Sequence, residues 1–100
     1  MTTWFVSRHP GAVDWAAQQN LSVDRHMAHL DPAQVEQGDA VIGTLPVHLA
    51  HKVCQRGARY INLSLDMPAH WRGRELNANE LQACNARLES FTITANHNPT

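Results

Sequence analysis

The segment Thr3-Trp4-Phe5-Val6-Ser7-Arg8-His9-Pro10-Gly11 has the pattern of a short buried strand that leads directly into a helix. Thr3 to Val6 form the expected strand, and Pro10 suits the first helical position, where its missing N–H costs no hydrogen bond. Gly11 allows the backbone to come close to a ligand. The turn therefore places a hydroxyl, a guanidinium and an imidazole at a helix start, whose free amides and partial positive charge favour an anion such as phosphate.

Arg8 and His9 also admit the simpler interpretation of ordinary turn residues. Three polar groups of different chemistry follow the apolar strand without a spacer, however, and this order favours a functional turn. We therefore take Ser7, Arg8 and His9 as the candidate catalytic residues.

The length and the charge of the chain limit its fold and its partners. A chain of 100 residues has room for one hydrophobic core, so residues 1–100 are expected to form a single domain. The formal net charge of −1 argues against a general nucleic-acid coat protein, so long nucleic acids are not expected as partners and any anion site must be local. Seven histidines make the charge sensitive to pH near neutrality.

Two further features indicate a cytoplasmic location. No apolar run is long enough to cross a bilayer, and the N-terminus lacks the layout of a signal peptide, so no membrane partner is expected. Cys54 and Cys84 each fall within an expected amphipathic helix rather than in a C-x-x-C pair, which indicates reduced core thiols. A disulfide between the two cysteines is the alternative.

Strand and helix patterns alternate along the chain. The expected strands share short apolar runs, at residues 3–6, 21–30, 40–45, 58–65 and 91–95. The expected helical segments share helical spacing or a capping signal, at residues 11–19, 32–37 and 47–56 and from Asn77 through Leu81, Cys84 and Leu88. The tail from Asn96 onward is expected to fray. This alternation predicts a small three-layer α/β domain with a mostly parallel sheet.

The site is expected beyond the carboxyl ends of the strands, where the strand order reverses. If the strand at residues 3–6 pairs with the one at 40–45, a crevice opens between the loops at 7–11 and 43–46. Both loops carry a glycine, a hydroxyl and a proline at a helix start, although the second loop alone is more typical of a plain strand-to-helix turn. The expected ligand-binding residues of the crevice are Pro10, Gly11, Gly43, Thr44, Leu45 and Pro46.

Three more residues are candidates for ligand binding. His48, in the first turn of the second long helix, could reach the crevice, whereas His51 is expected to face solvent. Asn62 and Ser64 end the fourth strand and could line the same crevice, or they could be ordinary polar residues of a strand edge. Arg72 lies in a basic loop that could close over a phosphate or simply be solvated.

The sequence gives little support for a metal or a cofactor. His26 and His29, with Asp24 and Asp31 nearby, could be read as a metal site, but the spacing of a zinc-binding helix motif is missing. There is no G-x-G-x-x-G or P-loop, and Ser7 is not on a G-x-S-x-G elbow. We therefore expect no metal ligands and no cofactor.

Three blocks of the sequence resemble a small CRISPR-associated family, the Csx-type family numbered sixteen of type III systems. They are Trp4 to Ala12 (WFVSRHPGA), Gly38 to Val47 (GDAVIGTLPV) and Arg72 to Leu76 (RGREL). The resemblance implies a Rossmann-like domain related to CRISPR-associated sensor domains, working as a homodimer on cyclic oligoadenylates. The implied activity is that of a ring nuclease, which cleaves cyclic tetra-adenylate to linear products and so switches off the antiviral response.

Such a cleavage needs no metal if a ribose 2′-hydroxyl attacks the neighbouring phosphate. On that reading Arg8 stabilises charge, His9 serves in acid–base catalysis, and Ser7 and Thr44 position phosphate oxygens. Adenines could stack on Trp71 or Trp4, although Trp4 suits the core better.

Three other functions are compatible with the same residues. The first is a sponge or sensor that binds the cyclic nucleotide without cutting it. The second is a metal-dependent hydrolase built on the histidines, and the third is a structural partner of an effector complex.

Overall fold

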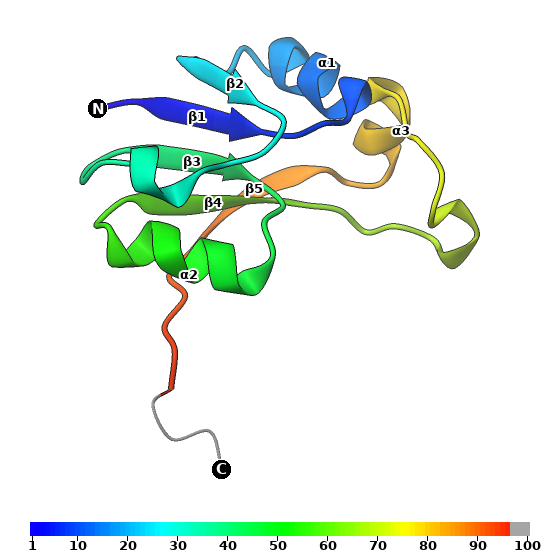
Figure 1. The fold of residues 1–100 in the computed structure, drawn as a ribbon. Helices are drawn as coiled ribbons and strands as arrows, with labels where there is room; N and C mark the ends of the chain where they lie inside the picture. The colour runs from blue at the N-terminus through cyan, green and yellow to red at the C-terminus, as the bar shows by residue number, and fades with distance from the viewer. Residues whose placement is uncertain (97–100) are drawn as a thin grey trace.

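The computed structural model describes residues 1–96 and contains a five-stranded sheet with helices on both faces (Figure 1). The strands are β1 (Thr3–Val6), β2 (Arg25–Met27), β3 (Ala40–Gly43), β4 (Arg59–Ser64) and β5 (Arg87–Phe91). The α-helices are α1 (Pro10–Gln18), α2 (Val47–Gln55) and α3 (Ala78–Ala83), and the 3₁₀ turns are η1 (Pro32–Gln34) and η2 (Ala69–Trp71). Of the tail that is expected to fray, residues 97–100 lie outside the described residues.

The strand order is β2-β1-β3-β4-β5, and only β5 runs antiparallel to its neighbour within the described sheet. β1 pairs with β3 in parallel, with Trp4 opposite Val41. The chain leaves β1 toward β2 on one side and reaches β3 on the other, so the strand order reverses at β1. This arrangement confirms the mostly parallel sheet and the expected pairing of the first strand with the strand at residues 40–45.

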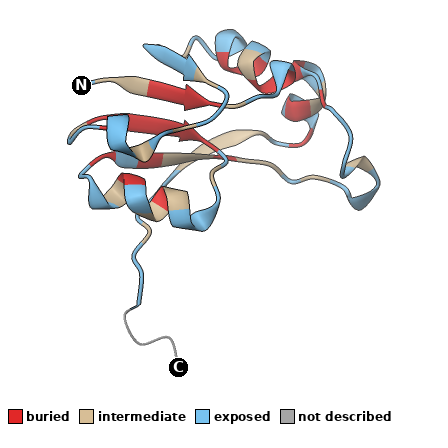
Figure 2. Cartoon of the chain, viewed as in Figure 1, coloured by how far each residue is buried: buried red, intermediate tan, exposed pale blue. Residues whose placement is uncertain are grey.

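Alternate residues of the strands supply two separate cores, one on each face of the sheet. Phe5 and Ile42 pack with α1 and α3 on one face. Trp4, Val41 and Tyr60 pack with α2 on the other. Every residue of β3 is buried, and Figure 2 shows the central strands as the most buried part of the fold. The three-layer Rossmann-like α/β fold is therefore confirmed.

Gly11 is required by a contact within the protein. A Cβ on this residue would lie 1.9 Å from the carbonyl oxygen of Leu76, so the start of α1 touches the backbone that leads into α3. The interpretation that Gly11 admits a ligand is therefore wrong. The close approach that only glycine permits here is between two segments of the backbone.

The expected boundaries differ from the structure at four places. The second strand covers Arg25–Met27 rather than residues 21–30, and the turn after Asp31 is the short η1. The capping box of Asn77 is present, but α3 ends before Asn85, which adopts a left-handed conformation with φ of 56°. Leu88 therefore belongs to β5 and not to a helix, and this strand begins at Arg87 rather than Phe91.

Asp39 is a buried carboxylate, 3% exposed, that ties three segments together. It accepts hydrogen bonds from the backbone N–H of Thr2 at 2.8 Å and of Glu36 at 2.9 Å, and from the indole N–H of Trp4 at 3.1 Å. The two backbone donors, with the indole after them, hold the pKa of Asp39 below its usual value. Because all three partners donate, the site is built for the ionised form.

No helix within residues 1–96 has both the length and the apolar character needed to cross a membrane.

Cys54 is half-buried in α2 and Cys84 is buried at the end of α3, and both are free thiols as expected.

The first prediction concerns the pH dependence of stability. The folded-state pKa of Asp39 lies below that of an unfolded aspartate, about 3.9, so this carboxylate stabilises the fold above that pH and the contribution is lost as the pH falls through the folded-state pKa. Asp39→Asn should therefore lower the free energy of unfolding at pH 7. The difference in free energy of unfolding between the parent and this variant should become smaller as the pH falls. Urea titrations between pH 2 and 7 measure this.

Asp14→Asn is the matched control, because Asp14 is exposed on α1. It should change the free energy of unfolding at pH 7 by about 0.5 kcal/mol or less, as exposed substitutions usually do. The free energy of unfolding of Asp39→Asn should still fall somewhat at acidic pH, because hydrogen bonds from Asn85 and Arg87 also hold the pKa of Asp66 below its usual value. An Asp39→Asn curve parallel to that of the parent would contradict the assignment.

The second prediction concerns the contact at Gly11. Gly11→Ala should lower the free energy of unfolding by about 1–3 kcal/mol, because the methyl group forces α1 away from the Leu76 carbonyl. Ala17→Val, which adds bulk at an exposed position of the same helix, should cost less than about 1 kcal/mol. Equal losses of stability in the two variants would show that the contact is not tight.

Candidate functional site

A pocket of about 560 Å³ opens at the carboxyl ends of β1 and β3, where the strand order reverses. This is the position at which open parallel sheets bind ligands. The volume lies within the range of about 300–1,000 Å³ that is usual for small-molecule sites. The expected crevice between the loops that follow these two strands is therefore present.

The lining of the pocket has an apolar part and a polar part. The apolar residues are mostly buried or half-buried and come from the sheet, the helices and the loop after β4: Val6, Ala12, Ala28, Leu30, Leu45, Leu49, Leu63, Leu65, Met67, Leu76 and Leu81. The polar residues are mostly exposed: Ser7, Arg8, His9, His29, Thr44, Arg74 and Glu75. This division suits a ligand with a flat apolar body and a charged group that faces solvent.

The turn after β1 is held in place by hydrogen bonds to β2. The backbone N–H of Ser7 donates to the carbonyl of Met27 at 2.9 Å, and the Nε2 atom of His26 lies 2.9 Å from the carbonyl oxygen of Ser7. The Ser7 hydroxyl oxygen accepts from the backbone N–H of His9 at 3.1 Å, which leaves its proton available for a ligand. His26 is thus a structural partner of the turn.

His9 lies beside a carboxylate from a distant part of the chain. Its Nδ1 atom is 2.7 Å from Oε1 of Glu75, and the side chains of the two residues are 54% and 61% exposed. Within residues 1–96, the Nε2 atom of His9 has no hydrogen-bond partner. The ring therefore has one nitrogen engaged and one available.

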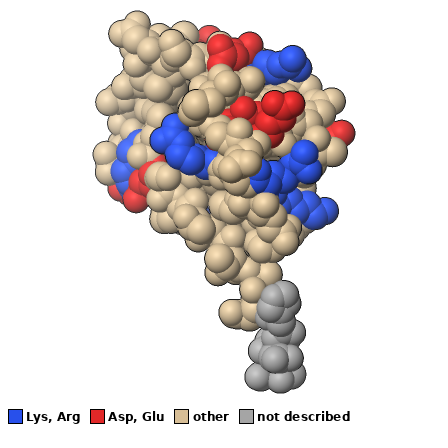
Figure 3. Space-filling view, turned by 90° about the vertical axis from the view of Figure 1, so that its left-hand side faces the viewer, with Lys and Arg blue, Asp and Glu red and all other residues tan. Residues whose placement is uncertain are grey.

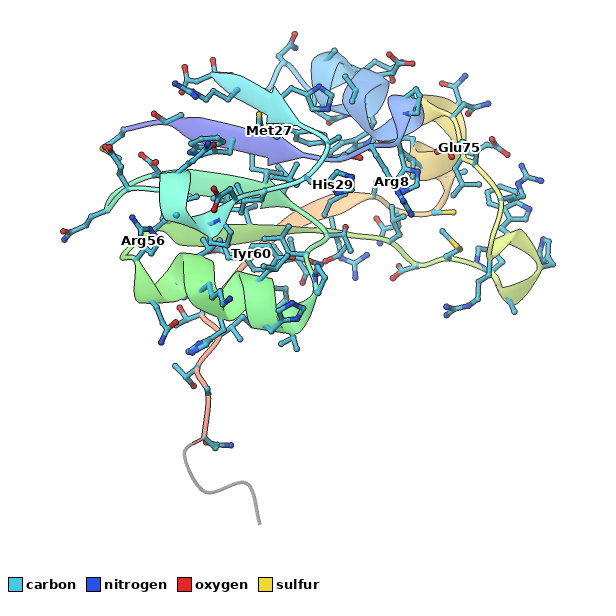
Figure 4. All side chains as sticks on the ribbon, viewed as in Figure 1. Arg8, Met27, His29, Arg56, Tyr60 and Glu75 are labelled. Atoms are coloured by element: carbon cyan, nitrogen blue, oxygen red, sulfur yellow. The ribbon has the colours of Figure 1, made fainter. Side chains whose placement is uncertain are left out.

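Arg8 contributes a cation that is not neutralised by a neighbour. It is exposed and lines the pocket, and it forms no ion pair within the described residues. Figure 4 shows Arg8, His29 and Glu75 at the same end of the sheet. Arg56 lies at the opposite end, where its guanidinium donates to the carbonyls of Val35 and Ala33 and has a structural role.

The start of α1 contributes less to an anion site than its position suggests. Pro10 has no N–H, and the amides of Ala12 and Val13 both donate to the carbonyl of His9. His9 itself forms no side-chain cap. Positive charge at the pocket therefore comes chiefly from Arg8 rather than from free helix amides.

Thr44 lines the pocket, but its hydroxyl proton is already used. The hydroxyl donates to the carbonyl of Leu63 at 3.0 Å, so Thr44 cannot donate to a phosphate oxygen in this arrangement. The next backbone N–H, that of Leu45, donates to the Tyr60 hydroxyl at 3.1 Å. Burial raises the pKa of that phenol, which keeps it protonated. The expected role of Thr44 as a phosphate donor is therefore corrected.

Ser7, Arg8, His9, Gly43, Thr44, Leu45 and Pro46 line the pocket as expected. Other candidates lie outside its lining: Pro10, Gly11, His48, Asn62 and Arg72. Gly43 is packed against a neighbouring strand, since a Cβ on it would lie 2.6 Å from the carbonyl oxygen of Val6.

The residues outside the lining have other partners or face solvent. The amide oxygen of Asn62 accepts from the Tyr60 hydroxyl at 2.5 Å, and its N–H₂ donates to Ser64 at 2.8 Å on the α2 face. His48 is exposed. His51, which was expected to face solvent, is half-buried, with Nδ1 3.1 Å from the carbonyl oxygen of Ile93.

The basic loop contributes Arg74 to the pocket and not Arg72. The Arg74 guanidinium pairs with Glu80 and lies over the ring of Trp71, 4.9 Å from its centroid. Trp4 is 3% exposed and donates to Asp39, so it is a core residue and cannot stack on a ligand.

The sequence-based prediction included the basic loop that contains Arg74 but chose Arg72 from it, and it missed His29 and Glu75 as pocket residues. A signal for His29 was available, because His29 follows β2. This strand runs parallel to β1, so the two strands end at the same edge of the sheet. Glu75 carries no local signal, since its contact with His9 spans 66 positions of the chain.

The structure shows neither a surface patch of one charge on the face drawn in Figure 3 nor a metal-binding cluster among the described residues. Figure 3 shows the side of the molecule at the amino ends of the strands, where basic and acidic side chains are interspersed and neither sign dominates. Among residues 1–96 there is no group of three or more histidine, cysteine, aspartate or glutamate side chains that could hold a metal ion.

Comparison with protein-family models identifies the family to which the chain belongs. Residues 4–94 match the model described as "Putative CRISPR-associated protein (Cas_VVA1548)", and this range includes every residue that lines the pocket. Comparisons with curated proteins and with solved structures found no match. The match covers most of the sequence, and the chain therefore belongs to this family of CRISPR-associated proteins.

Proposed function

We propose that the protein is a ring nuclease that cleaves cyclic tetra-adenylate to linear products and so switches off type III CRISPR signalling. The observation that carries the proposal is the pocket at the strand-order reversal, where Arg8, His9 and His29 lie beside an apolar surface. Membership of a CRISPR-associated family and the resemblance of three sequence blocks to the Csx-type family numbered sixteen support it.

The pocket suits one nucleotide of such a ring. The apolar part can take an adenine, and the exposed Arg8 can bind the adjoining phosphate through two parallel N–H donors. A pocket of about 560 Å³ takes a drug-sized part of the ligand rather than the whole ring. A two-fold homodimer would present two such pockets to a ligand that has rotational symmetry of its own.

The residues available can complete the reaction without a metal. The ribose 2′-oxygen attacks the neighbouring phosphorus, its proton passes to a base, and the P–O5′ bond breaks as the 5′-oxygen gains a proton. The products are a 2′,3′-cyclic phosphate and a 5′-hydroxyl. Two protons move, and within residues 1–96 His9 and His29 are the two imidazoles that line the pocket. Arg8 stabilises the charge on the non-bridging oxygens, and the Ser7 hydroxyl donates to one of them.

A sponge that binds the ring without cutting it is the second candidate. The predominance of apolar side chains in the lining favours tight binding of a base, which a sponge needs as much as a nuclease does. The two functions differ only in the fate of the ligand, so product analysis separates them.

Incubation of the purified protein with radiolabelled cyclic tetra-adenylate and excess EDTA tests the proposed function. Linear product that exceeds the protein concentration many times over supports a metal-independent ring nuclease. Intact ligand held in a fixed ratio to the protein makes it a sponge. Cleavage that EDTA abolishes makes it a metal-dependent hydrolase, and neither binding nor cleavage refutes the proposal.

Loss of the pocket cation should slow the reaction strongly. Arg8→Ala should lower the cleavage rate by about 100-fold or more, because the guanidinium stabilises charge that develops in the transition state. Arg72→Ala removes an exposed arginine outside the pocket and should change the rate by about twofold or less. Single-turnover rates for the parent and both variants measure this. Arg8→Ala that cleaves at the parent rate would remove Arg8 from the mechanism.

A sulfur-substituted substrate tests His29 as the group that protonates the leaving oxygen. His29→Ala should lower the rate on cyclic tetra-adenylate by about 10²- to 10⁴-fold. A ring whose bridging 5′-oxygens are replaced by sulfur should restore most of that rate, because a thiolate leaves without a proton. His70→Ala, at an exposed position outside the pocket, should behave as the parent on both substrates. An equal loss on both rings would contradict the role of His29.

A further inference from the structure

The contact between Glu75 and His9 bears on which nitrogen of the imidazole carries a proton. An ionised carboxylate can only accept hydrogen bonds, and Oε1 of Glu75 lies 2.7 Å from Nδ1 of His9. A hydrogen bond between these two atoms therefore requires a hydrogen on Nδ1, in the neutral ring as in the protonated one. In the neutral ring this leaves the lone pair on Nε2, the nitrogen without a partner among residues 1–96.

The residues immediately before and after Glu75 are both anchored by contacts with other parts of the protein. Before it, Arg74 is fixed by its ion pair with Glu80 and by its stacking on Trp71. After it, Leu76 is only 6% exposed, and its carbonyl occupies the space that a side chain at Gly11 would need. The contact between Glu75 and His9 is therefore built into the fold, although both side chains are more than half exposed.

Glu75 is also the single acidic residue in the lining of the pocket, within the part of the chain that the structure describes. The pocket's other imidazole, that of His29, has no ion pair with a described carboxylate. The two histidines that line the same pocket therefore differ in their hydrogen-bond partners. Of the two, His9 is the one with a ring nitrogen within hydrogen-bond distance of a described carboxylate.

We propose that Glu75 is a positioning residue that fixes His9 as the Nδ1–H tautomer, so that the ligand's proton is exchanged at Nε2. The inference rests on the proposed function and adds the atom at which the base acts. When the 2′-oxygen bonds to phosphorus, its proton moves to the lone pair of Nε2. The imidazolium that forms lies next to the Glu75 carboxylate, whose negative charge compensates the new positive charge. Glu75 itself touches neither the ribose nor the phosphate.

NMR of the free protein tests the tautomer without any need for activity. Long-range ¹H–¹⁵N correlation spectra of imidazole-labelled protein, recorded at mildly alkaline pH, distinguish the two neutral forms. Neutral His9 should show Nδ1 protonated in the parent and should shift toward the Nε2–H form in Glu75→Ala. His29 should give the same pattern in both proteins and serves as the internal control. A His9 pattern that does not differ between the two proteins would overturn the proposal, as would an Nε2–H form in the parent.

Kinetics then test whether the tautomer matters for the reaction. Glu75→Ala should lower kcat by about 10- to 1,000-fold and change KM by about twofold or less, because a misdirected base affects the chemical step and not binding. Glu36→Ala, an exposed glutamate outside the pocket, should keep the parent kcat. An effect of Glu75→Ala confined to KM would make Glu75 a binding residue and overturn the proposal.

A double variant separates positioning from an independent effect. If Glu75 acts through His9, then His9→Ala/Glu75→Ala should be no slower than His9→Ala alone. Losses that multiply in the double variant would overturn the proposal. If the parent itself forms no linear product, the proposed function fails, while the NMR comparison still decides whether Glu75 fixes the His9 tautomer.

Discussion

The close contact between the start of α1 and the backbone before α3 is the constraint on which the site depends. Gly11 has no side chain, so the Leu76 carbonyl can lie where a Cβ would otherwise be. This contact brings residues from the last third of the chain to a turn that follows the first strand. Without it, the pocket would keep its imidazole at His9 but lose the carboxylate of Glu75. A glycine that looks like a ligand-binding device thus shapes the site indirectly, by setting the distance between two backbone segments.

The place of the pocket and three residues of its lining could be predicted from the sequence. A buried strand followed by Ser7-Arg8-His9 and a second that ends in Gly43 are local patterns, and a general rule of parallel sheets places their carboxyl ends side by side. The position of the pocket was predictable because it depends only on neighbours in the chain and on strand order, whereas the chemistry of the turn stays a prediction. The same reasoning would have extended to His29 if β2 had been treated as part of the same edge.

What the sequence could not reveal depends on tertiary contacts. The hydroxyl of Thr44 looks available until the Leu63 carbonyl of the neighbouring strand is placed beside it. Leu88 follows Leu81 at helical spacing, yet the left-handed Asn85 between them ends the helix and turns the chain into β5. Glu75 lies in a loop with no periodicity at all. In each case the deciding partner comes from another element.

The proposed selection of an anion by a nearly neutral chain depends on the charges inside the pocket. A net charge of −1 gives no long-range attraction for a polyanion, so any binding energy must come from inside the pocket. There the Arg74 cation is paired with Glu80, while Arg8 has no described ion-pair partner. One uncompensated guanidinium beside a large apolar surface favours a ligand with both a flat apolar group and a phosphate over a bare phosphate or a long nucleic acid. Selectivity would then arise from the combination, because neither the cation nor the apolar surface binds strongly alone.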